Sequence, residues 1–242
     1  VADQMVRAAE GIGFFYVRGH GVSRDMLDET YTLSQAFFRS PDDVKDRVAV
    51  SGGHRGWLRI GEARMEGSER FDLKESFIWG LDVPPEDPDV IAGDRLLAVN
   101  RWPATPSGMR DVFNRYFTEM QRCGEQLLRA FALSLEIPPD YFIRHMDRPV
   151  SRAAAVWYPP QVPDLGDQQF GVSPHTDYGT LTLVQQDAVG GLQVRSRNGD
   201  WVTAPPIEDT FVVNVGDLLA RWTNDRFQST PHRVVNSSGQ ER

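Results

Sequence analysis

Hydrophobic residues follow two different spacings along the chain, and the first of them is helical. Apolar positions three and four residues apart form a continuous stripe over residues 107–135 and predict one long helix. Ser23 is a suitable N-cap for an earlier helix that ends near Phe38. A shorter helix over residues 2–10 is expected to lead into a buried strand over residues 14–17. The spacing therefore predicts a helical or mixed first part of the chain.

Beyond about residue 150 the pattern changes to short apolar runs separated by Gly, Pro, Asn and Asp. Such runs predict an antiparallel sandwich or barrel, and Asn198-Gly199 marks a hairpin turn between two of them. The expected strands cover residues 153–158, 180–185, 192–195, 201–204, 210–215 and 233–236. The expected fold is mainly β with helical support (α+β), in which the long helix buttresses a jelly-roll barrel. We expect one domain over residues 1–242, with its barrel core over residues 151–242.

Composition limits the classes of partner and the compartment. The chain has 242 residues and a net charge of −8, so it lacks the basic block that nucleic-acid binding requires. Cys123 is the single cysteine, which makes an internal disulfide impossible and favours a reducing compartment, the cytoplasm. No apolar run approaches the ~20 residues that span a bilayer, so no membrane partner is expected. The sequence begins at Val1 without Met and stops at Arg242, and both true ends are expected to lie outside it.

Three residues in the second part of the chain could bind one metal ion. His175 and Asp177 lie two residues apart, and side chains at that spacing point to the same face of an extended segment. A second strand can bring in His232, which follows Asp177 by 55 residues. Two imidazoles and one carboxylate on one face of an ion, with the other positions open, are typical of non-haem Fe(II) oxygenases. The spacing therefore predicts an iron site formed by these three residues.

The same residues also have a plainer interpretation. A His-x-Asp triplet is short enough to occur by chance, and a lone histidine on a strand is more often structural than a ligand. Of the other histidines, His20 falls in a turn, His54 in a glycine-rich stretch and His145 after the long helix. None of these three is expected to bind the metal.

Seven short motifs occur in a fixed order along nearly the whole chain. They lie at residues 13–22, 72–77, 100–103, 175–182, 191–194, 213–217 and 232–236. Each motif alone is weak, whereas the ordered series is specific. On these motifs the chain resembles the Fe(II)/2-oxoglutarate-dependent oxygenases, in particular their isopenicillin N synthase-like branch.

The resemblance implies a double-stranded β-helix and a site for Fe(II), 2-oxoglutarate and O2. It assigns the iron to His175, Asp177 and His232. Arg242 stands ten residues after His232, where the family has the arginine of an Arg-x-Ser signature that binds the co-substrate. Its planar fork suits the distal carboxylate of 2-oxoglutarate, and Tyr158 matches a tyrosine that helps to hold that carboxylate. The implied activity is oxidation of a small molecule by hydroxylation, desaturation or cyclisation, with release of succinate and CO2.

Two positions depart from the family pattern. Many relatives carry Asn two residues before the tyrosine, where this chain has Val156, and often a basic residue four before it, where this chain has Ala154. The identity of the primary substrate therefore does not follow from the resemblance.

Three other functions are compatible with the same residues. The nearest is an oxidase of the isopenicillin N synthase type that uses no 2-oxoglutarate and grips its substrate with Arg242. Another is a metal-free barrel used for binding or sensing. A zinc hydrolase is the third, because two histidines and one aspartate can also hold zinc with an open position. No hydrolytic general base is evident near these residues.

Overall fold

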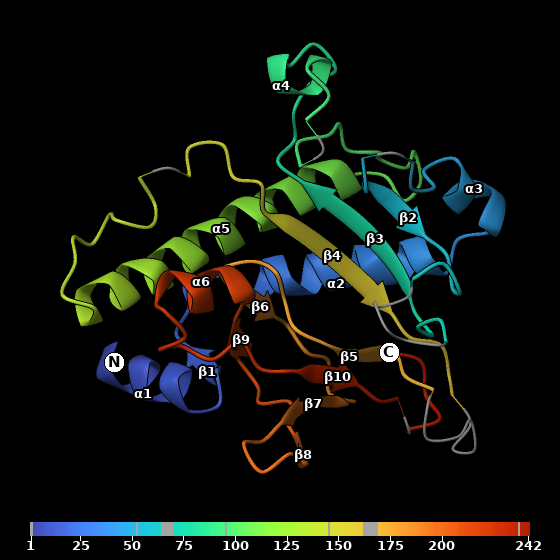
Figure 1. Cartoon of the computed structure of the whole chain (residues 1–242). Helices are drawn as coiled ribbons and strands as arrows, with labels where there is room; N and C mark the ends of the chain where they lie inside the picture. Colours follow the sequence, from blue (N-terminus) through green and yellow to red (C-terminus); the bar gives the residue numbers. More distant parts are fainter. Residues whose placement is uncertain are drawn as a thin grey trace.

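The computed structural model describes residues 2–51, 53–63, 70–94, 96–144, 146–161, 169–236 and 238–242. His145 lies outside these ranges. Six helices and ten strands are described within them (Figure 1). The helices are α1 (Ala2–Gly11), α2 (Arg24–Phe38), α3 (Asp42–Asp46), α4 (Pro88–Ile91), α5 (Met109–Ser134) and α6 (Asp217–Trp222). The strands are β1 (Phe14–Arg18), β2 (Gly56–Leu58), β3 (Glu75–Gly80), β4 (Arg152–Trp157), β5 (Val172–His175), β6 (Leu181–Val184), β7 (Leu192–Arg195), β8 (Trp201–Thr203), β9 (Thr210–Val215) and β10 (His232–Val234).

The helices expected from apolar spacing are present. Helix α5 is the predicted long helix, and it buries a stripe that includes Phe113, Leu127 and Phe131. Helix α2 begins after Ser23, whose side chain accepts a hydrogen bond from the backbone nitrogen of Met26, as expected of an N-cap. The two helices run side by side (Figure 1). No helix in the described ranges is long and apolar enough to cross a membrane.

The strands form three antiparallel sheets, so the fold is mixed α/β. Their strand orders are β1-β9-β6, β5-β10-β7-β8 and β2-β3-β4. Strand β1 pairs with β9 and β3 pairs with β4, so strands from the first part of the chain complete sheets of the second part. The two parts are thus joined by backbone hydrogen bonds.

Three buried clusters account for the arrangement of the sheets. The helical core lies between α1, α5, α6 and the face of β9 that carries Phe211, Val213 and Val215. The aromatic core packs one face of the β2-β3-β4 sheet against α2 and α5. The inter-sheet core brings together side chains of β1, β7 and β9, and its members are Phe14, Leu192, Val194 and Val212.

Two short helices occupy segments whose composition favours a turn or a loop. Gly216-Asp217 is typical of a turn, but α6 begins at Asp217 and buries Leu219 and Ala220 in the helical core. The proline-rich segment 84–88 ends in α4, in which Pro88 takes the first helical position after the N-cap Asp87. A six-residue and a four-residue helix are too short to give a helical spacing of apolar residues.

Asp82 ties the end of β3 to α5. Its carboxylate accepts hydrogen bonds from Trp102, Asn100, Arg110 and Asn114, at distances of 2.9–3.2 Å. Burial alone would raise the pKa of Asp82, but these hydrogen bonds outweigh burial and hold the pKa below its usual value.

We expect Asp82→Asn to lower the free energy of unfolding at pH 7 by about 1–3 kcal/mol, because hydrogen bonds to a charged group are lost. Because the pKa of Asp82 is lower in the folded state, its carboxylate stabilises the folded protein at every pH above its unfolded-state pKa of about 4. This stabilisation is lost as the pH falls through the lower, folded-state pKa. Urea unfolding at pH 7, 5 and 3 should therefore show the two proteins converging at pH 3. The exposed Asp147→Asn serves as the control, and an equal gap at pH 7 and pH 3 would contradict the role given to Asp82.

Candidate functional site

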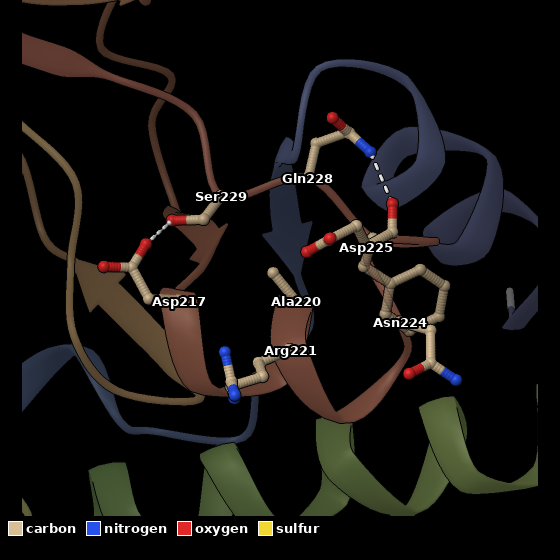
Figure 2. A pocket seen from close by; sticks show the side chains of 8 residues that line it. Asp217, Ala220, Arg221, Asn224, Asp225, Gln228 and Ser229 are labelled. Carbon is tan, nitrogen blue, oxygen red and sulfur yellow. Dashed lines mark hydrogen bonds between the residues drawn. The ribbon is translucent and has the colours of Figure 1, made fainter.

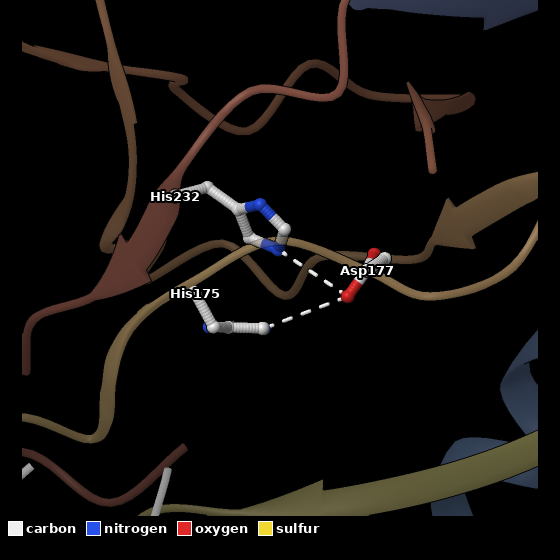
Figure 3. Close-up of side chains that lie close together, drawn as sticks. All are labelled: His175, Asp177 and His232. Carbon is white, nitrogen blue, oxygen red and sulfur yellow. Dashed lines mark ion pairs between the residues drawn. The ribbon is translucent and has the colours of Figure 1, made fainter. Parts of the chain in front are cut away.

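His175, Asp177 and His232 converge at one point (Figure 3). Strands β5 and β10 are neighbours, and their register places His232 opposite His175. The Nε2 atoms of His175 and His232 lie 3.5 Å and 3.7 Å from Oδ1 of Asp177. One ligand atom from each residue lies within 4.8 Å of the others, close enough for three bonds of about 2 Å to one ion. The structure thus brings together the three residues that the sequence predicted.

Asp177 reaches this point from a strand end. Strand β5 ends at His175, and Asp177 follows it by two residues, just before the chain bends at residues 178–180. Asp217 holds this segment in place. The backbone nitrogen of Asp217 donates to the Asp177 carbonyl at 2.7 Å, and the Thr176 hydroxyl donates to Oδ2 of Asp217 at 3.2 Å.

Backbone carbonyls fix the orientation of both imidazoles. Nδ1 of His175 lies 2.8 Å from the Ser173 carbonyl, and Nδ1 of His232 lies 3.1 Å from the Thr230 carbonyl. A carbonyl can only accept, so in the neutral rings Nδ1 carries the proton and Nε2 keeps a free lone pair. Both Nε2 atoms face Asp177, which is the tautomer that metal binding requires.

The carboxylate of Asp177 is held in its charged form. Burial alone would raise its pKa, but the neighbouring imidazoles of His175 and His232, together with hydrogen bonds from Thr182 and Asn214, hold the pKa well below its usual range. Nδ2 of Asn214 donates to Oδ2 at 2.9 Å, which leaves Oδ1 facing the imidazoles. Burial lowers the pKa of His232, with Asp177 opposing and His175 adding to the effect.

A buried carboxylate supports His175 from behind. Oδ1 of Asp72, which is fully buried, accepts from the backbone nitrogen of Ser173 at 2.9 Å and from its hydroxyl at 2.8 Å. Ser173 in turn offers its carbonyl to His175. Lys74 lies 3.6 Å from the other oxygen of Asp72. These three residues therefore set the position of the β5 end on which His175 stands.

Arg242 and Tyr158 lie together near this site. Two backbone hydrogen bonds join them, one in each direction, at 2.7 Å and 3.0 Å. The Arg242 guanidinium lies over the Tyr158 ring, 4.4 Å from its centroid, and Nη1 is 3.8 Å from Oδ1 of Asp187. The arginine side chain is 7% exposed, and its Nε has no hydrogen-bond partner among the described residues. Gly191 leaves room for the guanidinium, since a Cβ there would lie 3.2 Å from Nη2.

The other two histidines that the structure describes lie outside the cluster of His175, Asp177 and His232. His20 packs on Phe211, with ring centroids 4.0 Å apart, and accepts a hydrogen bond from the Val22 backbone. His54 is exposed.

A separate hollow of about 690 Å³ lies beside α6 (Figure 2). It is lined by Asp217, Ala220, Arg221, Asn224, Asp225, Phe227, Gln228 and Ser229. Its link to the cluster of His175, Asp177 and His232 is Asp217, whose Oδ1 accepts from the Ser229 hydroxyl at 2.5 Å while Oδ2 accepts from Thr176. The hollow therefore borders the segment that carries Asp177, and none of the three clustered residues lines it.

Four supporting residues were not identified from the sequence: Asp72, Ser173, Asp187 and Asn214. Asp72 and Asn214 fall within the recognised motifs at residues 72–77 and 213–217, so a signal for both existed. Asp187 and Ser173 fall outside every motif, and only the fold brings them to the site.

Two family models match the chain. The model of the 2OG-Fe(II) oxygenase superfamily matches residues 142–242. The model described as non-haem dioxygenase in morphine synthesis N-terminal matches residues 1–105. The first match contains the three clustered residues together with Arg242 and Tyr158.

Whole-chain comparisons agree with the family models. A 2-oxoglutarate-Fe(II) type oxidoreductase of Metarhizium rileyi is 37% identical over 100% of this chain and 70% of its own length. A homoarginine-6-hydroxylase of Oryza sativa is 33% identical over 98% of this chain and 74% of its own length. A Neurospora crassa crystal structure in complex with alpha-KG superposes with a TM-score of 0.87 at 30% identity, covering 100% of this chain and 76% of that one.

A 2OG-Fe(II) oxygenase family protein from Caulobacter crescentus gives a TM-score of 0.86 at 29% identity, covering 100% of this chain and 78% of that one. The similarity thus extends over the full length of the chain at both the sequence and the structural level. The chain belongs to the Fe(II)- and 2-oxoglutarate-dependent oxygenases, and it is an enzyme of that family.

Proposed function

We propose that His175, Asp177 and His232 hold the Fe(II) of this oxygenase. The observation that carries the proposal is the donor set itself: two neutral imidazoles with Nε2 free and one desolvated carboxylate with Oδ1 free, all facing one point. Three protein ligands on one face leave positions open for a co-substrate, as in the facial triad of non-haem iron oxygenases. The Phe14 ring lies edge-on to His232, with centroids 5.3 Å apart, and limits water on that side.

Arg242 and Tyr158 are proposed to bind the distal carboxylate of 2-oxoglutarate. A buried guanidinium with unused donors is costly unless an anion satisfies it, and 2-oxoglutarate supplies that anion. Asp187 is too far from Arg242 for a hydrogen bond, so the guanidinium donors of Arg242 remain available to a bound carboxylate. Burial raises the pKa of Tyr158 to about 12, which keeps the hydroxyl protonated and able to donate.

The residues of this chain position the reactants and exclude water, while the bound groups supply the oxidation. When bound, Fe(II) and 2-oxoglutarate supply the activation of O2 that converts 2-oxoglutarate to succinate and CO2 and oxidises the primary substrate. The backbone carbonyls of Ser173 and Thr230 keep the histidine rings oriented throughout. Asn214 keeps Asp177 from rotating.

The finer architecture is proposed to be a double-stranded β-helix. The inter-sheet core lies between the β1-β9-β6 and β5-β10-β7-β8 sheets, which supports two facing sheets of one barrel. We also infer a single domain over residues 1–242, with its barrel core over residues 151–242. The pairing of β1 with β9 and of β3 with β4 supports one unit rather than two.

The primary substrate is proposed to be a small molecule. Related proteins are named for such compounds: the Oryza sativa relative is a homoarginine-6-hydroxylase, and the Neurospora crassa protein was solved with alpha-KG and thymine. A rice dioxygenase for auxin oxidation gives a TM-score of 0.77 at 28% identity. These compounds differ in chemistry, so the family alone does not fix the substrate class.

Asp177→Ala should abolish stable iron binding, because it removes the only anionic ligand of the three. We expect the purified protein to hold less than about one tenth of the wild-type iron, with 2-oxoglutarate-dependent succinate formation at background. Metal analysis and succinate assay measure the two effects. Asp147→Ala changes an exposed aspartate and should behave as wild type. Full activity in Asp177→Ala would refute the ligand assignment.

Arg242→Gln should raise the KM for 2-oxoglutarate at least about tenfold, because a charge-assisted hydrogen bond contributes about 1.5–3 kcal/mol. Iron affinity, measured by anaerobic titration, should stay within about twofold of wild type, since Arg242 does not touch the metal ligands. Arg242→Lys should restore part of the affinity as a single-point cation. If the KM for 2-oxoglutarate were unchanged in Arg242→Gln, its role as the co-substrate anchor would be wrong.

A further inference from the structure

One face of the β2-β3-β4 sheet is turned away from the aromatic core. Phe77 and Trp79 on β3 and Ala155 and Trp157 on β4 pack into that core. Side chains alternate along a strand, so the residues between them lie on the opposite face. The register pairs them across the two strands as Ser76 with Val156, Ile78 with Ala154 and Gly80 with Arg152.

This opposite face borders the proposed iron site. Lys74 precedes β3 and Tyr158 follows β4, so both stand at the end of the sheet that meets β5 and the end of the described chain (Figure 1). The Tyr158 ring lies against Gly171, where a Cβ would come within 2.8 Å of it, and Lys74 pairs with Asp72 at 3.6 Å. The charge of Asp177 acts on Lys74. The face therefore forms a wall beside the metal ligands.

Three cations lie on or against this wall. The Lys74 side chain is only 12% exposed. The Arg55 guanidinium packs over Gly80, where a Cβ would lie 2.6 Å from Nη2, and it donates only to backbone carbonyls, including that of Leu96 at 2.9 Å. Arg152 is exposed, and its side chain makes no ion pair or hydrogen bond with any residue that the structure describes.

The charges on this wall do not balance. Asp72 compensates Lys74, whereas Arg55 and Arg152 have no acidic partner in the described part of the chain. Burial lowers the pKa of Lys74, Asp72 opposes that effect, and Arg152 lowers the pKa further. Burial and Arg152 also lower the pKa of Arg55. The charge of Arg152 thus repels both other cations, and an anion bound to Arg152 would relieve that repulsion.

The β4 part of the wall between the cations carries small apolar side chains. Ala154 and Val156 are the β4 residues between Arg152 and Tyr158 on this face, and both are small. A hydrocarbon skeleton can lie over them, with its charged end at Arg152 and its other end toward the metal ligands. The arrangement suits a molecule with one charged end and an apolar body.

We propose that Arg152, with Arg55 beside it at Gly80, is the subsite for a carboxylate of the primary substrate, so that this enzyme oxidises a small carboxylic acid. The proposal rests on the proposed function, because it places the substrate beside the iron held by His175, Asp177 and His232. Arg152 is a specificity residue, since it contacts the substrate at a distance from the reacting atoms. A guanidinium binds a carboxylate through two parallel hydrogen bonds.

The test uses matched pairs of acids and primary amides with the anaerobic enzyme loaded with Fe(II) and 2-oxoglutarate. The pairs increase in size: hexanoate and hexanamide, phenylacetate and phenylacetamide, 3-phenylpropionate and 3-phenylpropionamide. Calorimetry measures each Kd. We expect at least one acid to bind about tenfold tighter than its amide, as a charge-assisted pair provides. Arg152→Gln should remove that preference, and the exposed control Arg7→Gln should retain it.

Three outcomes would overturn the proposal. One is that no acid binds more tightly than its amide, or that none of the six compounds binds. Another is that the acid preference survives in Arg152→Gln. A third is that Arg152→Gln weakens 2-oxoglutarate itself while acid preference is unchanged, which would assign the wall to the co-substrate. The wild-type protein loaded with Fe(II) is titrated with 2-oxoglutarate first, because absence of 2-oxoglutarate binding would refute the proposed function. If 2-oxoglutarate binds and no acid preference is found, only the carboxylate subsite is refuted.

Discussion

The pairing of β10 with β5 is the interaction on which the site depends. It sets His232 opposite His175, and the segment after β5 then needs only two residues to bring Asp177 to the same point. Each imidazole is held by a carbonyl two residues earlier in its own segment, so the backbone that builds the sheet also selects the tautomer. A shift of one residue in this register would turn His232 to the other face of the strand, so that the three side chains would no longer converge.

Strand β9 connects this local arrangement to the rest of the fold. Phe211, Val213 and Val215 face the helical core, while Val212 enters the inter-sheet core and Asn214 reaches Asp177. Strand β9 is therefore one of the elements through which the long helix supports the site. Buried apolar packing on one face holds the strand in place, which allows the other face to carry a polar group in a buried setting.

Much of this could be predicted from the sequence, for reasons that differ by element. Helix α5 is long enough for its apolar spacing to be unambiguous, and β7 and β9 are bounded by turn residues, so all three were predicted within two residues of their observed ends. The clustering of His175, Asp177 and His232 was predicted from residue type and spacing. The contribution of Asp72 could not be, because it depends on a contact with Ser173 that spans 101 positions of the chain. Nor does local pattern reveal that β4 pairs with β3 or that Arg152 and Lys74 share one wall.

The central claim is that the protein has one open iron site at which 2-oxoglutarate chelates the metal, and visible spectroscopy tests this chelation directly. The apo-protein is titrated anaerobically with Fe(II) and then with 2-oxoglutarate while the visible spectrum is recorded. A weak metal-to-ligand charge-transfer band should develop only when both are present, and it should saturate at one equivalent of each. Iron binding without such a band would contradict co-substrate chelation at this site, and absence of iron binding would contradict the assignment of His175, Asp177 and His232.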